Sequence, residues 1–254
     1  MTLTYYHAEP LANSLKSMIP LKEKALDYRS VYVDLHQFDQ HAPWFVAINP
    51  EGQVPVLDHD GTIVTHTSVI NEYLEDAFPD APPLRPIDAA GRARMRNWNR
   101  FIDEHVMNFV SMHGWHRMVS VVARSVEQGA FEQLVERIPL HEMREKWKAA
   151  RSGFSDSDLA NATRKIVLAV DKVEEQLGRT PWLCGDTYTL ADINFYANCG
   201  MMVERMFPDL AIADRAPRLV EWRERMKARP AVQAALQGED RTAPGLRTFS
   251  GHAR

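Results

Sequence analysis

Hydroxyl residues open two of the helices that the sequence predicts, and they are the first candidates for chemistry. Ser14, with Asn13 beside it, follows a predicted strand at 2–6, and Thr67, with Ser68 beside it, follows a predicted hairpin. The start of a helix carries free backbone N–H groups and a positive partial charge, which together favour a bound anion. The same side chains are preferred helix N-caps, so each has a purely structural alternative.

The two cysteines, Cys184 and Cys199, lie late in the chain and cannot form a CxxC pair or a four-ligand zinc site. The ten histidines show no HExxH or comparable spacing, so the sequence predicts no metal site. Any thiol chemistry must therefore use a thiol supplied by another molecule.

Composition excludes several classes of protein. The chain has 254 residues, 45% of them hydrophobic, which is enough for one large domain or two small ones. A net charge of -4 gives no sign of the basic surface that nucleic-acid binding needs. We find no apolar run of the roughly 20 residues that a membrane-spanning helix needs, and the start lacks a signal-peptide pattern, so we expect a cytoplasmic protein.

The elements that must position these hydroxyls form a βαβ unit followed by a ββα unit. They are a strand at 2–6, a helix at 14–26 containing Pro20, a strand at 30–34, a hairpin at 54–65 and a helix at 67–78. We expect Asn13 or Ser14, and Thr67 or Ser68, at the N-caps. The hairpin should turn at Asp60-Gly61. The apolar face of the last helix would consist of Val69, Ile70, Tyr73, Leu74 and Phe78.

The rest of the chain predicts helices only. Four prolines between 79 and 86 indicate an extended linker, which we place at 81–88. Thr189 and Asp192 have the spacing of a capping box at the start of a buried, almost entirely apolar helix. The predicted helices span 89–124, 127–149, 157–177, 190–207 and 216–236, and the predicted tail at 238–254 is flexible.

Four features in this order resemble the glutathione transferase superfamily: Gln53-Val54-Pro55 before a strand, a hydroxyl residue at the next helix start, the proline-rich linker, and Thr189 to Asp192. The resemblance covers nearly the whole chain. It implies an α+β thioredoxin-like N-terminal domain at 1–80 that binds glutathione, and an all-α helical-bundle C-terminal domain at 89–237. It also implies glutathione as co-substrate and a homodimer.

Three strings narrow the resemblance. They are Asn13 to Lys16, Phe38 to Phe45, and Lys146 to Phe154. They are similar to bacterial glutathione-dependent β-etherases, which cleave β-aryl ether bonds of lignin fragments, and to the branch that inverts the R-configured substrate. Ser111 to Trp115 is similar there too.

The resemblance implies roles for individual residues. Val54-Pro55 would be the cis-proline turn whose backbone pairs with the cysteinyl part of glutathione, and an ordinary edge proline is the alternative. The hydroxyl of Ser14 would stabilise the glutathione thiolate, with Asn13 as the rival donor. Tyr5 and Tyr6 are alternative donors if the residues of this chain align with those of the family in a different register.

The rest of the expected glutathione site comes from three segments. By the resemblance, Gln40, with His41 beside it, would contact the glycyl carboxylate, and Thr67 would hold the γ-glutamyl carboxylate. A solvated amide at position 40 and a simple N-cap at position 67 are the alternatives. His66 departs from the family, where an acidic residue usually takes the glutathione ammonium. Asp103 could substitute for it across a dimer interface, or lie on a solvated helix face.

A hydrophobic aromatic substrate would lie against a group of side chains in the helical domain: Phe109, Met112, His113, Trp115, His116 and Trp147. Packing in the core is the alternative for each. Three functions remain open: cleavage of β-aryl ethers of α-keto aromatics, a glutathione reaction on other aromatic or halogenated electrophiles, and glutathione binding without turnover.

Overall fold

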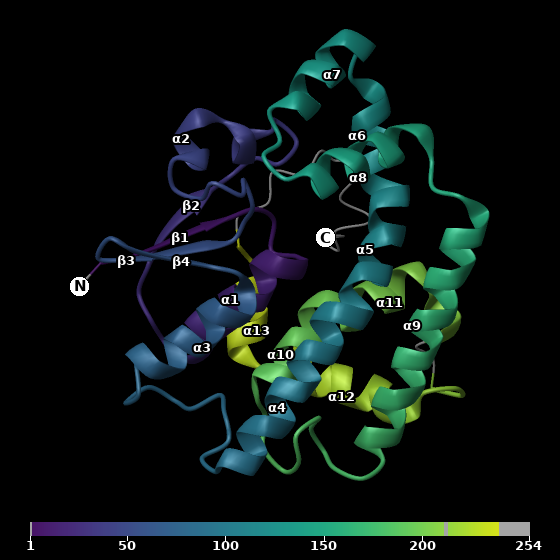
Figure 1. Cartoon of the computed structure of the whole chain (residues 1–254). Helices are drawn as coiled ribbons and strands as arrows, with labels where there is room; N and C mark the ends of the chain where they lie inside the picture. Colours follow the sequence, from purple (N-terminus) through teal and green to yellow (C-terminus); the bar gives the residue numbers. More distant parts are fainter. Residues whose placement is uncertain (1, 211–212, 239–254) are drawn as a thin grey trace.

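A four-stranded mixed sheet organises the first part of the chain in the computed structural model, which describes residues 2–210 and 213–238. Its strands are β1 (Leu3–His7), β2 (Arg29–Tyr32), β3 (Val56–His59) and β4 (Thr62–Thr65), in the order β2-β1-β3-β4. β1 pairs parallel with β2 and antiparallel with β3. This is the mixed sheet of a thioredoxin-like domain, so the predicted fold class is confirmed (Figure 1).

The β3–β4 hairpin turns at Asp60-Gly61, as predicted. His59 pairs with Thr62, so the loop has two residues, and both have positive φ angles of 49° and 89°. Those angles suit the mirror-image turns that match the twist of a hairpin.

Helix α1 (Ala12–Glu23) begins two residues before the predicted start, and its N-cap is Leu11, which has no side-chain cap bond. The expectation of Asn13 or Ser14 as N-cap is therefore wrong. Both lie in the first turn. The helix also ends before Leu26, at Glu23, and Ala25 takes a positive φ of 50°, outside the right-handed helical region.

Helix α3 (Thr67–Ala77) packs on α1, with Ile70 and Leu74 fully buried. The predicted apolar face is wrong at one position, since Val69 is 54% exposed. Its place on the inner face is taken by Asn71, whose side chain donates to the Lys16 carbonyl 3.1 Å away. The spacing of hydrophobic residues cannot predict a buried polar side chain of this kind, which is buried because it bonds a backbone carbonyl.

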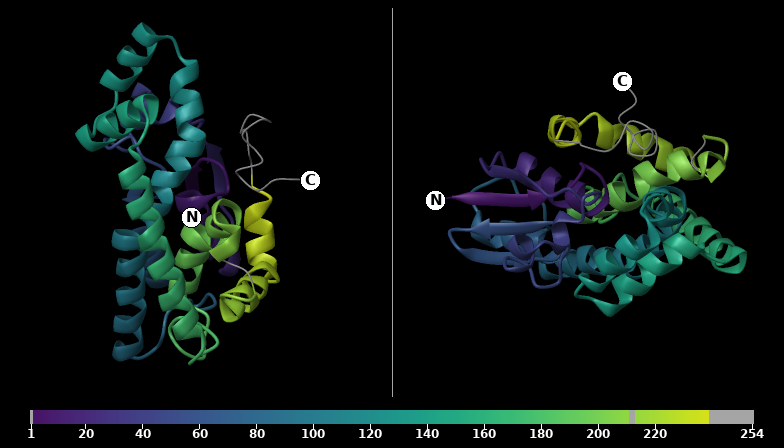
Figure 2. Two further views of the ribbon diagram at one scale, coloured as in Figure 1. Left: turned by 90° about the vertical axis from the view of Figure 1, so that its right-hand side faces the viewer. Right: turned by 90° about the horizontal axis from the view of Figure 1, so that it is seen from above.

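The second part of the chain is helical. Its helices are α4 (Ala89–Phe101), α5 (Met107–Gly114), α6 (Ser120–Ser125), α7 (Gln128–Glu136), α8 (His141–Ser152), α9 (Asp156–Leu177), α10 (Leu190–Phe195), α11 (Met201–Met206), α12 (Pro217–Lys227) and α13 (Pro230–Leu236). Three π-helical segments join some of them end to end: η2 (Ile102–Val106), η3 (Trp115–Val119) and η4 (Tyr196–Gly200). The predicted helix at 89–124 is thus one continuous rod with two π-helical segments (Figure 2).

Two predicted helices are each broken in two. The segment 127–149 divides into α7 and α8, and 216–236 divides into α12 and α13. Pro139 and Pro230 mark the breaks, because proline lacks the N–H that a helix interior needs and disfavours helical geometry in the residue before it. Arg229 accordingly has an extended ψ of 127°. The predicted flexible tail lies outside the described residues after Gly238.

The predicted capping box is confirmed at the start of α10. The Thr189 side chain accepts from the Ala191 N–H, and the Asp192 carboxylate accepts from the Thr189 N–H at 3.1 Å. The same carboxylate accepts from the Trp222 indole at 3.0 Å, which ties α10 to α12. The box therefore fixes the buried helix that passes through the core of the helical domain.

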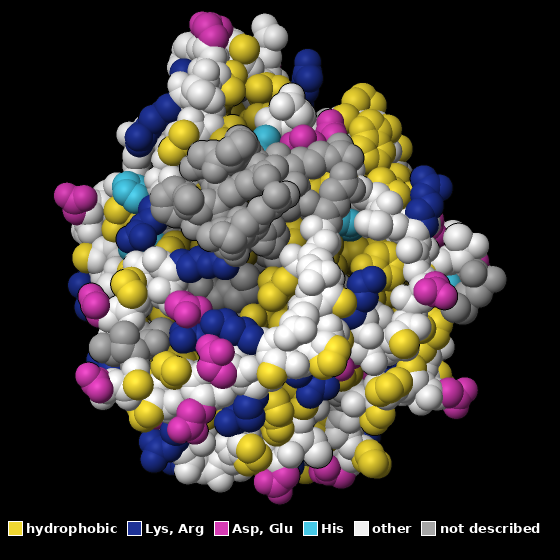
Figure 3. All heavy atoms as spheres, turned by 180° about the vertical axis from the view of Figure 1, so that it is seen from behind, with side chains coloured by type: hydrophobic (Ala, Val, Ile, Leu, Met, Phe, Trp, Pro, Cys, Tyr) yellow, Lys and Arg dark blue, Asp and Glu magenta, His cyan; other side chains and the backbone are white. Residues whose placement is uncertain are grey.

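The two parts share one packed interface. Helix α1 contacts α10, η4 and α13, and the Lys24–Glu75 ion pair of 2.7 Å is buried beside the linker. The Leu84 N–H donates to Glu75, so the linker is fixed to α3. On the described part of the face in Figure 3, cationic and anionic side chains are interspersed. Among the described residues, no helix is both long and apolar enough to cross a bilayer.

Candidate active site

A pocket of about 210 Å³ lies where the thioredoxin-like sheet meets the helical domain. It is lined by Asn13, Asn49, Glu51, Gln53, Val54, Pro55, Thr65, His66, Thr67, Ser68, Asp103 and Met107. Seven of these twelve residues were assigned to the site from the sequence. Residues from α1, the loop before β3, the start of α3 and the segment η2 thus meet at one place.

The start of α3 offers unoccupied donors to this pocket. His66 is the N-cap, with a positive φ of 61° and no side-chain bond to the helix, so the prediction of Thr67 or Ser68 near the cap is shifted by one residue. The first N–H groups of the helix are therefore left for a ligand. Positive φ in a residue other than glycine is sparsely populated and occurs often at ligand sites.

The turn at Val54-Pro55, whose peptide bond is cis, forms a second wall of the pocket. The side chain of Asn49 holds this turn in place by donating to the Gln53 carbonyl at 2.7 Å. The loop before it lies close against Gln40 and His41, because a Cβ on Gly52 would meet the His41 ring at 2.7 Å. The loop that leads into the turn is therefore tightly packed against Gln40 and His41.

Gln40 and His41 lie beneath this loop and do not line the pocket. Both are buried, and Gln40 Oε1 and both ring nitrogens of His41 have no hydrogen-bond partner. Burial lowers the pKa of His41 to about 4, so its ring is neutral at neutral pH. Their predicted contact with the glycyl carboxylate stays a prediction.

Asp103 presents an acidic group to the pocket of its own chain. Its carboxylate accepts from Lys16 Nζ at 2.7 Å, from Ser68 Oγ at 2.5 Å and from Asn194 Nδ2 at 3.2 Å. Burial lowers the pKa of Lys16, and the charge and hydrogen bond of Asp103 act against that shift. The carboxylate is therefore fixed in position while its open side faces the pocket.

A second carboxylate lies at the rim, because Glu51 Oε1 is 3.6 Å from His66 Nε2. His66 thus has an acidic neighbour. Two carboxylates, Glu51 from the loop before β3 and Asp103 from η2, therefore line this pocket and are available to a cationic group.

Of the candidate sulfur donors, Asn13 lines the pocket and Ser14 does not. Ser14 is 3% exposed, and its hydroxyl accepts from the Ala8 N–H at 3.0 Å. Tyr5 is fully buried, donates to the Ser14 carbonyl, and has its pKa raised by burial, while Tyr6 packs against Phe45. Neither tyrosine is placed to act on a ligand here.

Comparison with known proteins decides the family. The chain matches the model of the glutathione S-transferase N-terminal domain over residues 1–76 and that of the C-terminal domain over residues 144–225. It is 40% identical to protein LigF of Sphingobium sp. strain SYK-6, over 95% of both chains. The chain belongs to the glutathione transferase family. It is an enzyme of that family, and the family uses glutathione as co-substrate.

Solved structures and a more distant relative agree with this family. The crystal structure of the β-etherase LigF matches with a TM-score of 0.91 and 39% identity, over 94% of this chain and 100% of that one. A glutathione transferase homologue from Sulfitobacter, solved with bound glutathione, matches with a TM-score of 0.64 and 26% identity, over 92% of this chain and 96% of that one. Protein URE2 of Eremothecium gossypii is 28% identical, over 94% of this chain and 68% of its own.

The aromatic residues expected around the substrate of this transferase fall into two sets. The rings of Trp115 and Trp147 pack edge to face, with their centroids 5.2 Å apart. The centroid of the Trp147 ring lies 4.6 Å from that of Phe38, which belongs to the thioredoxin-like domain. His116 lies against Phe154 at the border of the same cluster.

The other set faces inward in the helical domain. The His113 ring nitrogen Nε2 lies 3.1 Å from Thr163 Oγ1, and the ring packs on Phe207, which places His113 against α9 and the end of α11. Phe109 packs against the main core, and Met112 is half-buried on α5. Only the first set therefore borders the thioredoxin-like domain, which carries the Val54-Pro55 turn of the pocket.

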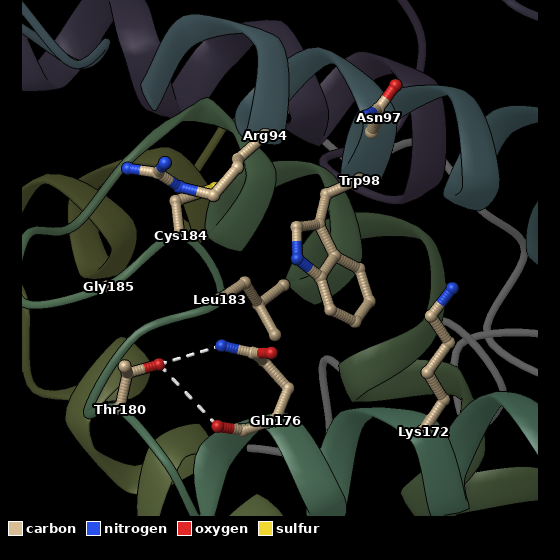
Figure 4. Close-up of a pocket in the computed structure, with 9 residues that line it drawn as sticks. All are labelled: Arg94, Asn97, Trp98, Lys172, Gln176, Thr180, Leu183, Cys184 and Gly185. Atoms are coloured by element: carbon tan, nitrogen blue, oxygen red, sulfur yellow. Dashed lines mark hydrogen bonds between the residues drawn. The ribbon is translucent and has the colours of Figure 1, made fainter. Parts of the chain in front are cut away.

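A larger cavity of about 530 Å³ lies elsewhere in the transferase, between α4, α9 and the segment 180–185 (Figure 4). Cys184 is part of its wall, but burial raises the pKa of this thiol to about 11. Burial also raises the pKa of Cys199. Both thiols are therefore protonated at neutral pH, which agrees with the need for a thiol from outside. No metal-binding cluster occurs among the residues that the structure describes.

Sequence reasoning missed seven residues of the site. Five of them line the pocket, namely Asn49, Glu51, Thr65, Ser68 and Met107, and two bond Asp103, namely Lys16 and Asn194. Lys16 and Asp103 are 87 positions apart in the chain, so no local pattern could pair them. One signal was available, since Lys16 lies in a mostly apolar stretch from Leu15 to Leu21, and a buried lysine needs a partner.

Proposed function

We propose that this transferase uses the thiolate of glutathione to cleave the β-aryl ether bond of α-keto aromatic substrates, releasing a phenol. The observation that carries the proposal is the pocket shared by the Val54-Pro55 turn, the open start of α3 and Asp103, in a chain similar over its whole length to the β-etherase LigF.

Glutathione would lie with its cysteinyl backbone against Val54. Its γ-glutamyl carboxylate would accept hydrogen bonds from the first N–H groups of α3, which have no cap of their own. Its ammonium would meet Asp103 of the same subunit, so the absence of an acidic residue at position 66 does not leave that charge unpaired.

The sulfur would then lie toward Asn13, the only α1 residue that lines the pocket. A donor at this place stabilises the thiolate, which is the reactive form. Ser14 would act indirectly, by fixing the segment from Ala8 to Asn13 through its bond to the Ala8 N–H. Thiolate attack on the carbon that bears the aryloxy group, next to the ketone, forms the C–S bond and breaks the C–O bond with inversion.

The test is incubation of the protein with glutathione and a racemic α-keto β-aryl ether, followed by chromatography of phenol and thioether. We expect equal amounts of both products and rapid consumption of one enantiomer only. Phenol release without glutathione would refute the mechanism. Turnover of model aryl halides without turnover of any aryl ether would favour the other transferase reaction.

Comparison of Asn13→Ala with Ser14→Ala tests the sulfur donor. We expect Asn13→Ala to lower kcat by about 10- to 100-fold, somewhat less than the loss of one oxyanion donor elsewhere, since backbone N–H groups remain. The ultraviolet absorbance of bound thiolate against pH gives an independent measurement. If the pH dependence of thiolate absorbance is the same in Asn13→Ala as in wild type, Ser14 and not Asn13 is the donor that stabilises the thiolate.

A further inference from the structure

Lys146 on α8 is a mostly buried lysine that forms no ion pair with any carboxylate in the described part of the chain. Its Nζ donates to Ser111 Oγ at 2.9 Å and lies 4.6 Å from the centroid of the Trp115 ring. Burial lowers the pKa of this lysine to about 8. Lysines that are buried without a carboxylate are rare in purely structural positions, because the cost of desolvation is not compensated.

Charged groups on the neighbouring elements do not compensate it either. Helix α8 packs against α6, α7 and η3, and Phe38 brings the loop of His41 to the same place. The titratable and cationic groups of these elements are His116 and Arg117 on η3, Arg124 on α6, Glu132 and Glu136 on α7, and Asp34, His36, Asp39 and His41 in the loop. Helix α8 itself carries His141, Glu142, Arg144, Glu145, Lys148 and Arg151. Glu145 pairs with Lys148, and Arg124 donates to a backbone carbonyl. None of them forms an ion pair with Lys146.

The lysine lies along the same helix face that borders the glutathione pocket. Met107 lines that pocket, Ser111 follows it four residues later on α5, and Trp115 follows four residues after that, at the start of η3. Residues four apart share a face, about 5–6 Å from one another. Because Lys146 contacts both Ser111 and Trp115, its ammonium lies one to two helical turns from the pocket wall.

The thioredoxin-like domain meets the helical domain at this point. Phe38 packs on Trp147, the residue next to Lys146, and Figure 1 shows α8 close to the segment between β2 and α2. The ammonium is thus held beside an aromatic cluster made of Phe38, Trp115 and Trp147, between the two domains. An aryl group attached to a carbon near the glutathione sulfur would extend toward this cluster.

We propose that Lys146 donates the proton to the departing phenoxide. The inference rests on the proposed ether cleavage. As the glutathione sulfur bonds to the substrate carbon, the C–O electron pair passes to the aryloxy oxygen, and a proton moves from Lys146 Nζ to that oxygen. The products are a thioether, a neutral phenol and a neutral amine, and the amine then takes a proton from water.

The surroundings of Lys146 suit this role. A carboxylate partner would hold the proton and neutralise the charge, whereas an unpaired ammonium both attracts the developing phenoxide and gives up its proton more readily. An acid works best when its pKa is close to the working pH, and burial moves this lysine toward that range. Ser111 and the Trp115 ring fix the direction of the donor.

The decisive measurement is the dependence of kcat/KM on the leaving group, in the full chain with saturating glutathione. The substrates are α-aryloxy ketones that release 4-nitrophenol, phenol or 4-methoxyphenol. We expect Lys146→Met to lower the rate by about 100-fold or more for 4-methoxyphenol and by less than about 5-fold for 4-nitrophenol, which needs no proton to leave. Lys146→Arg keeps the positive charge but does not release its proton. Its rate with 4-methoxyphenol as leaving group should therefore lie between those of wild type and Lys146→Met.

The pH profile gives a second readout. With 4-methoxyphenol as leaving group, wild-type kcat/KM should fall above pH 8 or so, where Lys146 loses its proton, and this descending limb should be absent from Lys146→Met. The matched control is Lys148→Met on the same helix. Lys148 is exposed and paired with Glu145, so its loss should leave both readouts unchanged.

Bound 4-nitrophenol tests the position of Lys146 without turnover. A neighbouring ammonium should lower the pKa of the bound phenol, seen in its visible spectrum, in wild type but not in Lys146→Met. No such shift in wild type would overturn the placement of Lys146, whatever the activity. An equal loss of rate for all three leaving groups would overturn the role of proton donor. No phenol release by wild type from any of the ethers would instead refute the proposed function, and the inference with it.

Discussion

Two substitutions in the Lys16–Asp103 pair should change glutathione affinity in opposite directions. Lys16→Met removes the cation that partly neutralises Asp103, so the glutathione ammonium should bind more tightly. Asp103→Asn keeps a hydrogen-bond acceptor but removes the charge. Charge-assisted hydrogen bonds contribute about 1.5–3 kcal/mol, roughly twice the neutral value, so Asp103→Asn should lose about 1–1.5 kcal/mol, or some 5- to 10-fold in Kd.

The same two substitutions should differ in their effect on stability. The Lys16 side chain is 2% exposed and that of Asp103 28%. Asp103→Asn therefore leaves an ammonium that water cannot reach, which costs about 3–5 kcal/mol in the free energy of unfolding. Lys16→Met leaves a carboxylate that keeps its bonds from Ser68 and Asn194 and some access to water, so it should cost less.

Urea unfolding gives the stabilities, and calorimetric titration with glutathione gives the affinities. The control is Glu72→Gln on α3, which breaks the more exposed pair with Arg96 of α4 and should change neither quantity by much. If both substitutions in the pair weaken binding, Asp103 does not face the ammonium, and the assignment of that group to the pocket of the same subunit is refuted.

Three further predictions concern single sites. Glu75→Gln leaves the buried Lys24 without its carboxylate and should destabilise the fold by about 3–5 kcal/mol in urea unfolding; a loss under 1 kcal/mol would mean that the lysine finds water. Thr189→Ala removes the side-chain half of the capping box and should cost about 0.5–2 kcal/mol by the same assay, with kcat unchanged in the folded variant. His66→Glu adds a carboxylate at the pocket rim and should tighten glutathione binding about 3- to 10-fold by calorimetry, and an unchanged Kd would place this side chain away from the ligand.

Much of the fold followed from local patterns. The hairpin at Asp60-Gly61 and the capping box at Thr189 are set by residues within three positions of one another, and both were predicted correctly. The helix breaks at Pro139 and Pro230 could also have been predicted, since proline ends a helix. They were missed because apolar residues at helical spacing occur on both sides of each proline, which favoured one long helix.

The site was only partly predictable, because its geometry depends on contacts between distant segments. Val54, Thr67 and Asp103 do meet in one pocket. No local pattern shows that the Ser14 hydroxyl turns inward to Ala8, or that Lys16 reaches Asp103 across the domain boundary. Those outcomes depend on how α1 packs against the helical domain, which only the folded chain determines.

The burial of Cys184 and Cys199 has a further consequence. A catalyst that handles electrophiles risks being alkylated by its own substrates, and the fastest target would be a thiolate of its own. In this chain both sulfurs are packed in the interior and stay protonated, so the most reactive thiol near an incoming electrophile is the one that arrives with each turnover. Self-inactivation is thereby suppressed by packing alone, without loss of the nucleophile that the reaction needs.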